Sequence, residues 1–263
     1  MHETPCNQPH CNLRYVQIAC TNCTDCKPEP QWLLQQSSGP APEETAKGRM
    51  RYIQLGFLLY FCTSFKYNRY TMHHIAVFAS GEGTNAENII RYFQHSDIAQ
   101  VSVVIYNKAE AGVKTKAESL STPAEFVAKD MLSDESRLLP LLDRYQVDFI
   151  VLAGFLLLIP RYLVHRYHQR IINIHPSLLP KHCGKGMYGM KVHEDVIRQG
   201  DTETGITIHL IDEEYDRGEI ILQAACPVLK GETAQQVARK VHALEYAHYP
   251  KAIEDLLRKT TQP

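Results

Sequence analysis

Short apolar runs that alternate with helical patterns constrain the fold of this chain more than any other feature. From His73 onward, runs rich in apolar and β-branched residues are separated by segments with apolar side chains at helical spacing. The runs cover residues 75–79, 101–106, 149–153 and 171–175, and the helical patterns cover residues 85–93, 111–119, 133–145 and 160–167. Continuous apolar runs are typical of strands buried on both faces. Their alternation with helices predicts right-handed βαβ units and a doubly wound, mostly parallel, Rossmann-like α/β sheet.

The pattern changes after Pro180. A glycine-rich loop leads into a helix over residues 192–199, and strands are expected at residues 205–211 and 219–227. The connection between these two strands is short, which predicts an antiparallel pair. A long final helix is expected over residues 233–257, with a break near Pro250.

Residues 1–71 differ in composition from the rest of the chain. Five of the eight cysteines lie in the first 26 residues, and no period of 2 or 3.6 continues through the segment. They are Cys6, Cys11, Cys20, Cys23 and Cys26. Such a composition buries too little apolar surface to offset chain entropy. We expect residues 1–71 to be a disordered extension, or to precede a true translation start at Met72, and residues 72–263 to form one catalytic domain.

Charge and hydropathy exclude several classes of partner. Lys and Arg total 28 against 29 for Asp and Glu, which leaves a formal charge of -1 and no basic field for nucleic acid or an acidic membrane. No apolar run approaches the roughly 20 residues that span a bilayer, and no signal peptide opens the sequence. A cytoplasmic protein that acts on small molecules, as a monomer or a homodimer, is expected.

A glycine turn joins the first strand to the first helix. The residues are Ser80-Gly81-Glu82-Gly83-Thr84-Asn85. A strand–glycine–helix turn presents main-chain N–H groups and a positive dipole end, which suits an anion such as a phosphate. The alternative is a tight turn in which Thr84 or Asn85 caps the helix.

Asn173 and His175 follow an apolar strand and lie two residues apart. Side chains two apart on a strand face the same side, and open α/β sheets bind ligands at the carboxyl ends of their strands. An imidazole transfers protons near neutral pH, and a carboxamide N–H donates to a developing oxyanion. The pair therefore suits acyl transfer, whereas the alternative is a histidine bonded to the backbone beside an asparagine that serves a turn.

An acidic loop, Asp212-Glu213-Glu214-Tyr215-Asp216-Arg217-Gly218, joins the two late strands. A carboxylate from this loop near His175 would orient the ring and stabilise its protonated form. The alternative is a solvated turn.

Four motifs together resemble the folate-dependent phosphoribosylglycinamide formyltransferases. They are residues 79–85, Leu152-Ala153-Gly154-Phe155, Asn173-Ile174-His175-Pro176-Ser177-Leu178-Leu179-Pro180-Lys181, and Asp216-Arg217-Gly218-Glu219-Ile220-Ile221-Leu222-Gln223. The resemblance covers essentially all of residues 72–257. It implies the formyltransferase fold and transfer of a formyl group from 10-formyltetrahydrofolate, a co-substrate, to the amine of glycinamide ribonucleotide in purine biosynthesis, without a metal.

The resemblance also implies roles for individual residues. The catalytic group is Asn173, His175 and Asp216. Glycinamide ribonucleotide would contact Gly83, Thr84, Asn85, His242 and Glu245. Formyl-folate would contact Leu156, Leu157, Leu158, Ile159, Asn173, Asp212, Glu213, Glu214, Tyr215 and Asp216.

Two other functions stay open at this stage. Formyltetrahydrofolate deformylase shares the fold, although it carries a regulatory domain in front that residues 1–71 do not resemble. A metal-binding module is the second alternative, because Cys20, Cys23 and Cys26 have a spacing found in zinc and iron–sulfur ligation.

Overall fold

The computed structural model describes residues 72–212 and 218–260. The predictions for residues 1–71, including the five cysteines, and for Glu213, Glu214, Tyr215 and Asp216 lie outside the described residues. All described residues belong to one compact unit, residues 68–263.

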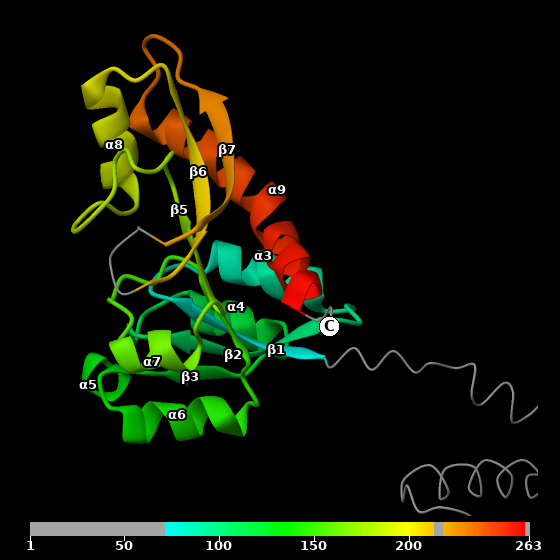
Figure 1. The fold of residues 1–263 in the computed structure, drawn as a ribbon. Helices are drawn as coiled ribbons and strands as arrows, with labels where there is room; N and C mark the ends of the chain where they lie inside the picture. The colour runs from blue at the N-terminus through cyan, green and yellow to red at the C-terminus, as the bar shows by residue number, and fades with distance from the viewer. Residues whose placement is uncertain (1–71, 213–217, 261–263) are drawn as a thin grey trace, which may run out of the picture. The chain divides into compact units, whose positions relative to one another are not determined.

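A mixed sheet forms the centre of this unit (Figure 1). Its strands are β1 (His73–Ala79), β2 (Ala99–Tyr106), β3 (Ala124–Phe126), β4 (Phe149–Leu152), β5 (Ile171–His175), β6 (Glu203–Leu210) and β7 (Ile220–Pro227). They lie in the order β3-β2-β1-β4-β5-β6-β7, parallel from β3 to β5 and antiparallel from β5 through β7. The predicted α/β sheet with antiparallel late strands is confirmed. Because β1 lies between β2 and β4, the strand order reverses there, where such folds place ligands.

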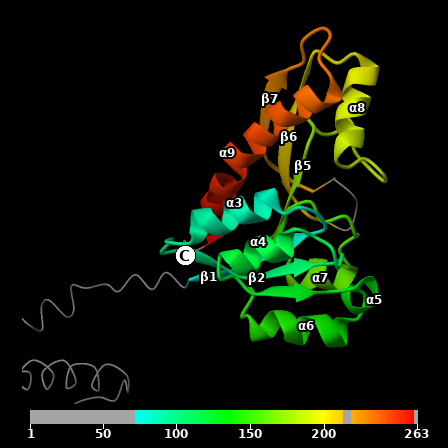
Figure 2. The ribbon, with the colours of Figure 1, turned by 180° about the vertical axis from the view of Figure 1, so that it is seen from behind.

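Helices cover both faces of the parallel part of the sheet. The helices of the described unit are α3 (Thr84–Phe93), α4 (Val113–Ser119), α5 (Lys129–Leu132), α6 (Glu135–Arg144), α7 (Arg161–Arg166), α8 (Met190–Gln199), which packs on α9, and α9 (Ala234–Thr260). Figures 1 and 2 show α3, α4 and α9 on one side and α5, α6 and α7 on the other.

Strand β1 shows why two layers form. Val77 packs into the core beneath α3, α4 and α9, and its neighbour Phe78 packs into the core beneath α6 and α7. Successive side chains of a strand point to opposite faces, so an uninterrupted apolar strand needs cover on both. None of the helices in the described part of the chain has the length and apolar character needed to cross a membrane.

Three details of the sequence prediction were wrong. The strand β3 has only three residues, too few for a periodic signal, and was not predicted. The helix expected over residues 133–145 is α6, which begins after Asp134 accepts the N–H of Ser136, but the four-residue helix α5 that precedes it was not predicted.

The third error concerns α9, which continues through Pro250 instead of breaking there. Proline has no N–H for the carbonyl four residues earlier, that of Tyr246. The Asn88 side chain donates to this carbonyl at 3.0 Å, so a neighbouring helix satisfies the acceptor that proline leaves.

Candidate active site

Asn173 lies on β5 directly opposite His209 of β6. Its Nδ2 donates to Nε2 of His209 at 3.1 Å, and Nδ1 of His209 donates to the Leu210 carbonyl at 2.9 Å. The carbonyl can only accept, so it fixes the His209 proton on Nδ1 and leaves Nε2 as an acceptor. The buried His209 ring therefore orients the Asn173 amide.

His175 ends β5 and is buried. Its Nε2 donates to the main-chain carbonyl of His182 at 2.9 Å. The residue that carries the predicted proton transfer is thus held by the loop that follows it in the chain.

Thr207 fixes the segment between these two histidines. Its hydroxyl, fully buried, donates to the Ser177 carbonyl at 2.7 Å and accepts the Leu179 N–H at 2.9 Å. The Gln223 side chain donates both to this hydroxyl and to the Leu179 carbonyl. Strands β6 and β7 thereby hold the run that follows His175 in one conformation.

Gly83 forms the turn between β1 and α3. It precedes the helix with φ 70°, and an added Cβ would lie 2.3 Å from the Val113 side chain. Only glycine fits this position without moving the backbone. No side chain caps α3, so the alternative of a cap by Thr84 or Asn85 is not what the structure contains.

Glu245 of α9 joins this turn to the late helix. Its Oε2 accepts from Nδ2 of Asn85 and from Nδ1 of His242, both at 2.9 Å. The hydrogen bond to Glu245 raises the pKa of His242, against the opposing effect of burial. The structure therefore brings together Asn85, His242 and Glu245, as predicted from positions far apart in the sequence.

His193 of α8 was not predicted. It is buried, and burial lowers its pKa to about 4, with a further lowering by His242 and His175 and an opposing effect of Glu245. The ring is therefore neutral at physiological pH. These neighbours place it between the Glu245 group and the end of β5.

The four residues predicted to contact folate, residues 156–159, differ in solvent exposure. Leu156 and Leu158 are 41% and 51% exposed, whereas Leu157 packs against the core and Ile159 is buried in it. The Leu156 N–H donates to the Ser80 hydroxyl at 2.9 Å, which ties the segment to the end of β1. Asp212 is exposed, and the other predicted acidic-loop residues lie in the part of the chain that is not described.

His209 and His193 are the residues that sequence reasoning missed. A signal existed for His209, since Thr207 and His209 alternate along the strand predicted at residues 205–211. For His193, the helical pattern predicted only that the side chain is buried. No neighbouring residue in the sequence indicated that it lies at a polar site.

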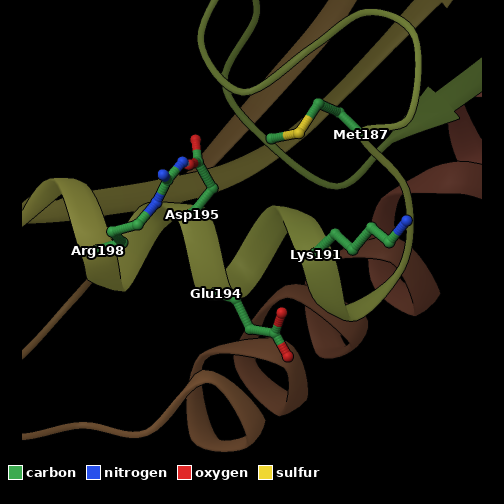
Figure 3. Close-up of a pocket in the computed structure, with 5 residues that line it drawn as sticks. All are labelled: Met187, Lys191, Glu194, Asp195 and Arg198. Carbon is green, nitrogen blue, oxygen red and sulfur yellow. The ribbon is translucent and has the colours of Figure 1, made fainter.

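Two shallow depressions lie elsewhere on the surface. One, of about 290 Å³, is lined by Met187, Lys191, Glu194, Asp195 and Arg198 along α8 and the preceding loop (Figure 3). The other, of about 470 Å³, lies between β3 and α6. Neither is lined by a predicted site residue. Within residues 72–212 and 218–260, no group of three or more His, Cys, Asp or Glu side chains could hold a metal ion.

Comparison with known proteins agrees with this geometry. The family model for formyl transferases matches residues 73–253. The phosphoribosylglycinamide formyltransferase of Haemophilus influenzae is 37% identical over 188 residues, which cover 70% of this chain and 86% of that protein. The crystal structure of the enzyme of the same name from Anaplasma phagocytophilum superposes with a TM-score of 0.65 at 35% identity, covering 72% of this chain and 89% of that one.

A plant relative is longer. The chloroplastic phosphoribosylglycinamide formyltransferase of Vigna unguiculata is 40% identical over 189 residues, 69% of this chain, and the match spans 60% of the plant protein. The family model and the relatives match the same part of the chain that forms the described unit. Because the model matches residues 73–253, this chain belongs to the formyl transferase family.

Proposed function

We propose that this chain transfers the formyl group of 10-formyltetrahydrofolate to the amine of glycinamide ribonucleotide. The observation that carries the proposal is the pair Asn173 and His175, fixed by separate partners on one face of β5 beside the Asn85, His242 and Glu245 group. An amide donor next to an imidazole suits attack of an amine on a formyl carbon.

Asn173 is assigned to the oxyanion. Its Nδ2 carries two hydrogens, and His209 accepts one of them. The second hydrogen then donates to the oxygen of the tetrahedral intermediate that forms when the amine attacks. Holding the amide in advance lowers the cost of reorganisation during the reaction.

His175 is assigned to proton transfer. The attacking amine loses a proton and the leaving folate nitrogen gains one, and the imidazole, or a water that it holds, carries the proton between them. Asp216 is assigned to orient the ring. Its carboxylate would stabilise the protonated imidazole by charge.

The Gly83 turn and α9 are assigned to the ribonucleotide. Two buried polar atoms here, Oδ1 of Asn85 and Nδ1 of His193, have no hydrogen-bond partner among the described residues. Buried polar atoms are normally paired, so a polar ligand at this place accounts for both. The exposed leucines Leu156 and Leu158 offer apolar contacts for the folate.

The test is an assay of formyl transfer with the purified chain. Formylation of glycinamide ribonucleotide that depends on 10-formyltetrahydrofolate supports the proposal. Release of tetrahydrofolate and formate in the absence of the amine acceptor would instead identify a deformylase. A chain that starts at Met72 and keeps full activity would support residues 72–263 as the catalytic domain.

A further inference from the structure

His182 lies on the loop after Pro180, and its main-chain carbonyl accepts the Nε2 proton of His175. A carbonyl oxygen can only accept a hydrogen bond. As long as it stays in place, the neutral His175 ring carries its proton on Nε2. The position of this loop therefore determines which nitrogen of the neutral His175 ring carries the proton.

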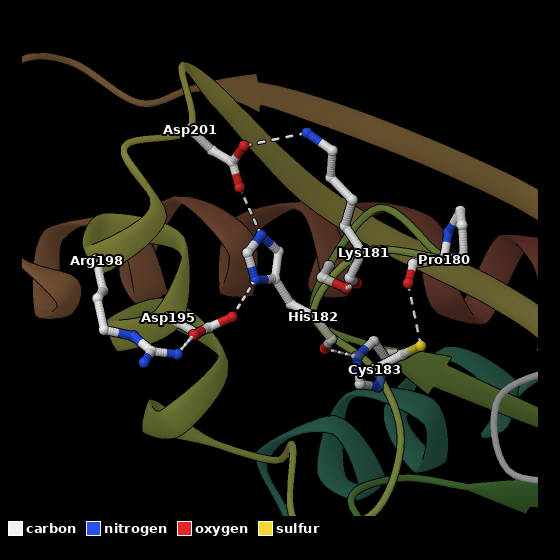
Figure 4. Close-up of polar contacts among 9 residues, drawn as sticks. Pro180, Lys181, His182, Cys183, Asp195, Arg198 and Asp201 are labelled. Carbon is white, nitrogen blue, oxygen red and sulfur yellow. Dashed lines mark hydrogen bonds and ion pairs between the residues drawn. The ribbon is translucent and has the colours of Figure 1, made fainter.

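The side chain of His182 is held at both ring nitrogens (Figure 4). Nδ1 lies 2.5 Å from Oδ2 of Asp195 on α8, and Nε2 lies 2.5 Å from Oδ2 of Asp201, which follows α8. The ring is only 8% exposed. Because ionised carboxylates only accept hydrogen bonds, each ring nitrogen that bonds to one acts as the donor.

Other charges complete the cluster. Arg198 of α8 pairs with the second oxygen of Asp195, and Lys181 lies 3.0 Å from Oδ1 of Asp201. The hydrogen bonds of Arg198 first and His182 second lower the pKa of Asp195. Those of Lys181 first and His182 second lower the pKa of Asp201. Both carboxylates are thus ionised, and the ring bridges them.

The backbone of His182 adopts an unfavourable conformation. Its φ of 52° lies in the left-handed region, which side chains with a Cβ adopt only when their surroundings enforce it. Gly184, Gly186 and Gly189 adopt positive φ in the same loop without that cost. The contacts with the two carboxylates are the side-chain interactions that hold this residue in place.

We propose that His182 is a positioning residue: its ring, held between Asp195 and Asp201, fixes the main-chain carbonyl that receives the Nε2 proton of His175. The kinetic part of the test rests on the proposed function, whereas the structural part does not. Nothing in the sequence marked His182, because its partners lie 13 and 19 residues later.

The experiment compares His182→Gly with Lys181→Met. Glycine keeps the left-handed backbone accessible and removes the ring. Lys181→Met removes the neighbouring cation from the same carboxylate and leaves the ring in place. Asp195→Ala is the second variant, since alanine preserves α8 while removing one anchor. Circular dichroism checks that each variant is folded.

Two readouts are measured. We expect His182→Gly to lower kcat by about 10- to 100-fold with little change in either KM, because misplacing a reacting group costs rate more than binding. At alkaline pH, ¹⁵N NMR of the His175 ring, identified by its loss in His175→Ala, should change from one Nε2–H tautomer to a mixture. Asp195→Ala should also lower kcat and give a mixture of His175 tautomers. Lys181→Met should change neither kcat nor the tautomer.

The outcomes separate the two proposals. A wild-type chain that forms no formylated product, but whose His175 tautomer changes in His182→Gly, supports the role of His182 and refutes the proposed function. A folded His182→Gly chain with unchanged kcat and a single His175 tautomer overturns the role of His182. The same result in Asp195→Ala would do so even if the glycine variant failed to fold.

Discussion

Two groups of residues meet at the candidate site, and they are built in opposite ways. The proposed catalytic cluster is Asn173, His175, His209 and the His182 carbonyl, and the proposed binding cluster is Gly83, Asn85, His193, His242 and Glu245. In the first, the reacting residues are neighbours on one strand, and remote residues only orient them. In the second, the residues themselves come from a turn and three helices, with Asn85 and Glu245 separated by 160 positions. Damage to the first should therefore lower kcat, and damage to the second should raise KM for the ribonucleotide.

The largest expected effect is on the catalytic cluster. His175→Ala should lower kcat by about 10² to 10⁴, the usual loss when a general acid–base group is removed. Steady-state kinetics with both substrates measure it. The control is His95→Ala, an exposed histidine outside both clusters, which should leave kcat unchanged. Near-normal turnover in His175→Ala would end the assignment of this residue.

The second prediction concerns the pH dependence of stability that His193, which lies between the clusters, produces. Its folded pKa of about 4 is below the ordinary 6.5, so the unfolded chain binds more protons between these values. Stability from this residue is present above about pH 6.5 and is lost as the pH falls through 4, by about 3 kcal/mol.

Urea unfolding of His193→Gln and of the wild type at several pH values measures this loss. The variant should be less sensitive to acid between pH 6.5 and 4, because glutamine takes up no proton. Equal acid sensitivity in the two chains would show that His193 is not held neutral.

Gly83→Ala tests the turn of the binding cluster. A Cβ at φ 70° that also meets Val113 should cost about 1 to 3 kcal/mol and displace the turn. We expect KM for the ribonucleotide to rise by about tenfold or more, with a smaller change in kcat. Gly81→Ala is a matched control, because a Cβ there meets nothing within 4 Å. If both variants behave alike, the Gly83 turn has no special part in binding.

Glu245→Gln gives the smallest expected effect and tests the centre of the binding cluster. The change weakens charge-assisted hydrogen bonds, so KM for the ribonucleotide should rise by about tenfold. Because Glu245 raises the pKa of His242, NMR titration should show that pKa falling in the variant. Asp255→Asn, the same chemical change at an exposed position on α9, should alter neither quantity. A fall in kcat alone would place Glu245 with the catalytic cluster instead.

Parts of the site were predictable from the sequence because their signal is local. Asn173 and His175 lie two apart at the end of an apolar run, so one strand assignment puts them on one face. The Gly83 turn follows from a strand and a helix joined by glycines. The four-residue α5 and the three-residue β3 were missed because each is too short to give a periodic signal.

The sequence by itself determined the fold class and the family, and it placed Asn173 and His175 on one strand, because hydrophobic periodicity and a contiguous motif need no knowledge of distant contacts. Only the tertiary structure decided the rest. His209 reaches Asn173 through antiparallel pairing of β5 with β6, His182 is held by α8, and His193 joins the two clusters. The physical reason is that an orienting hydrogen bond requires two groups within about 3 Å, a distance that chain separation does not encode.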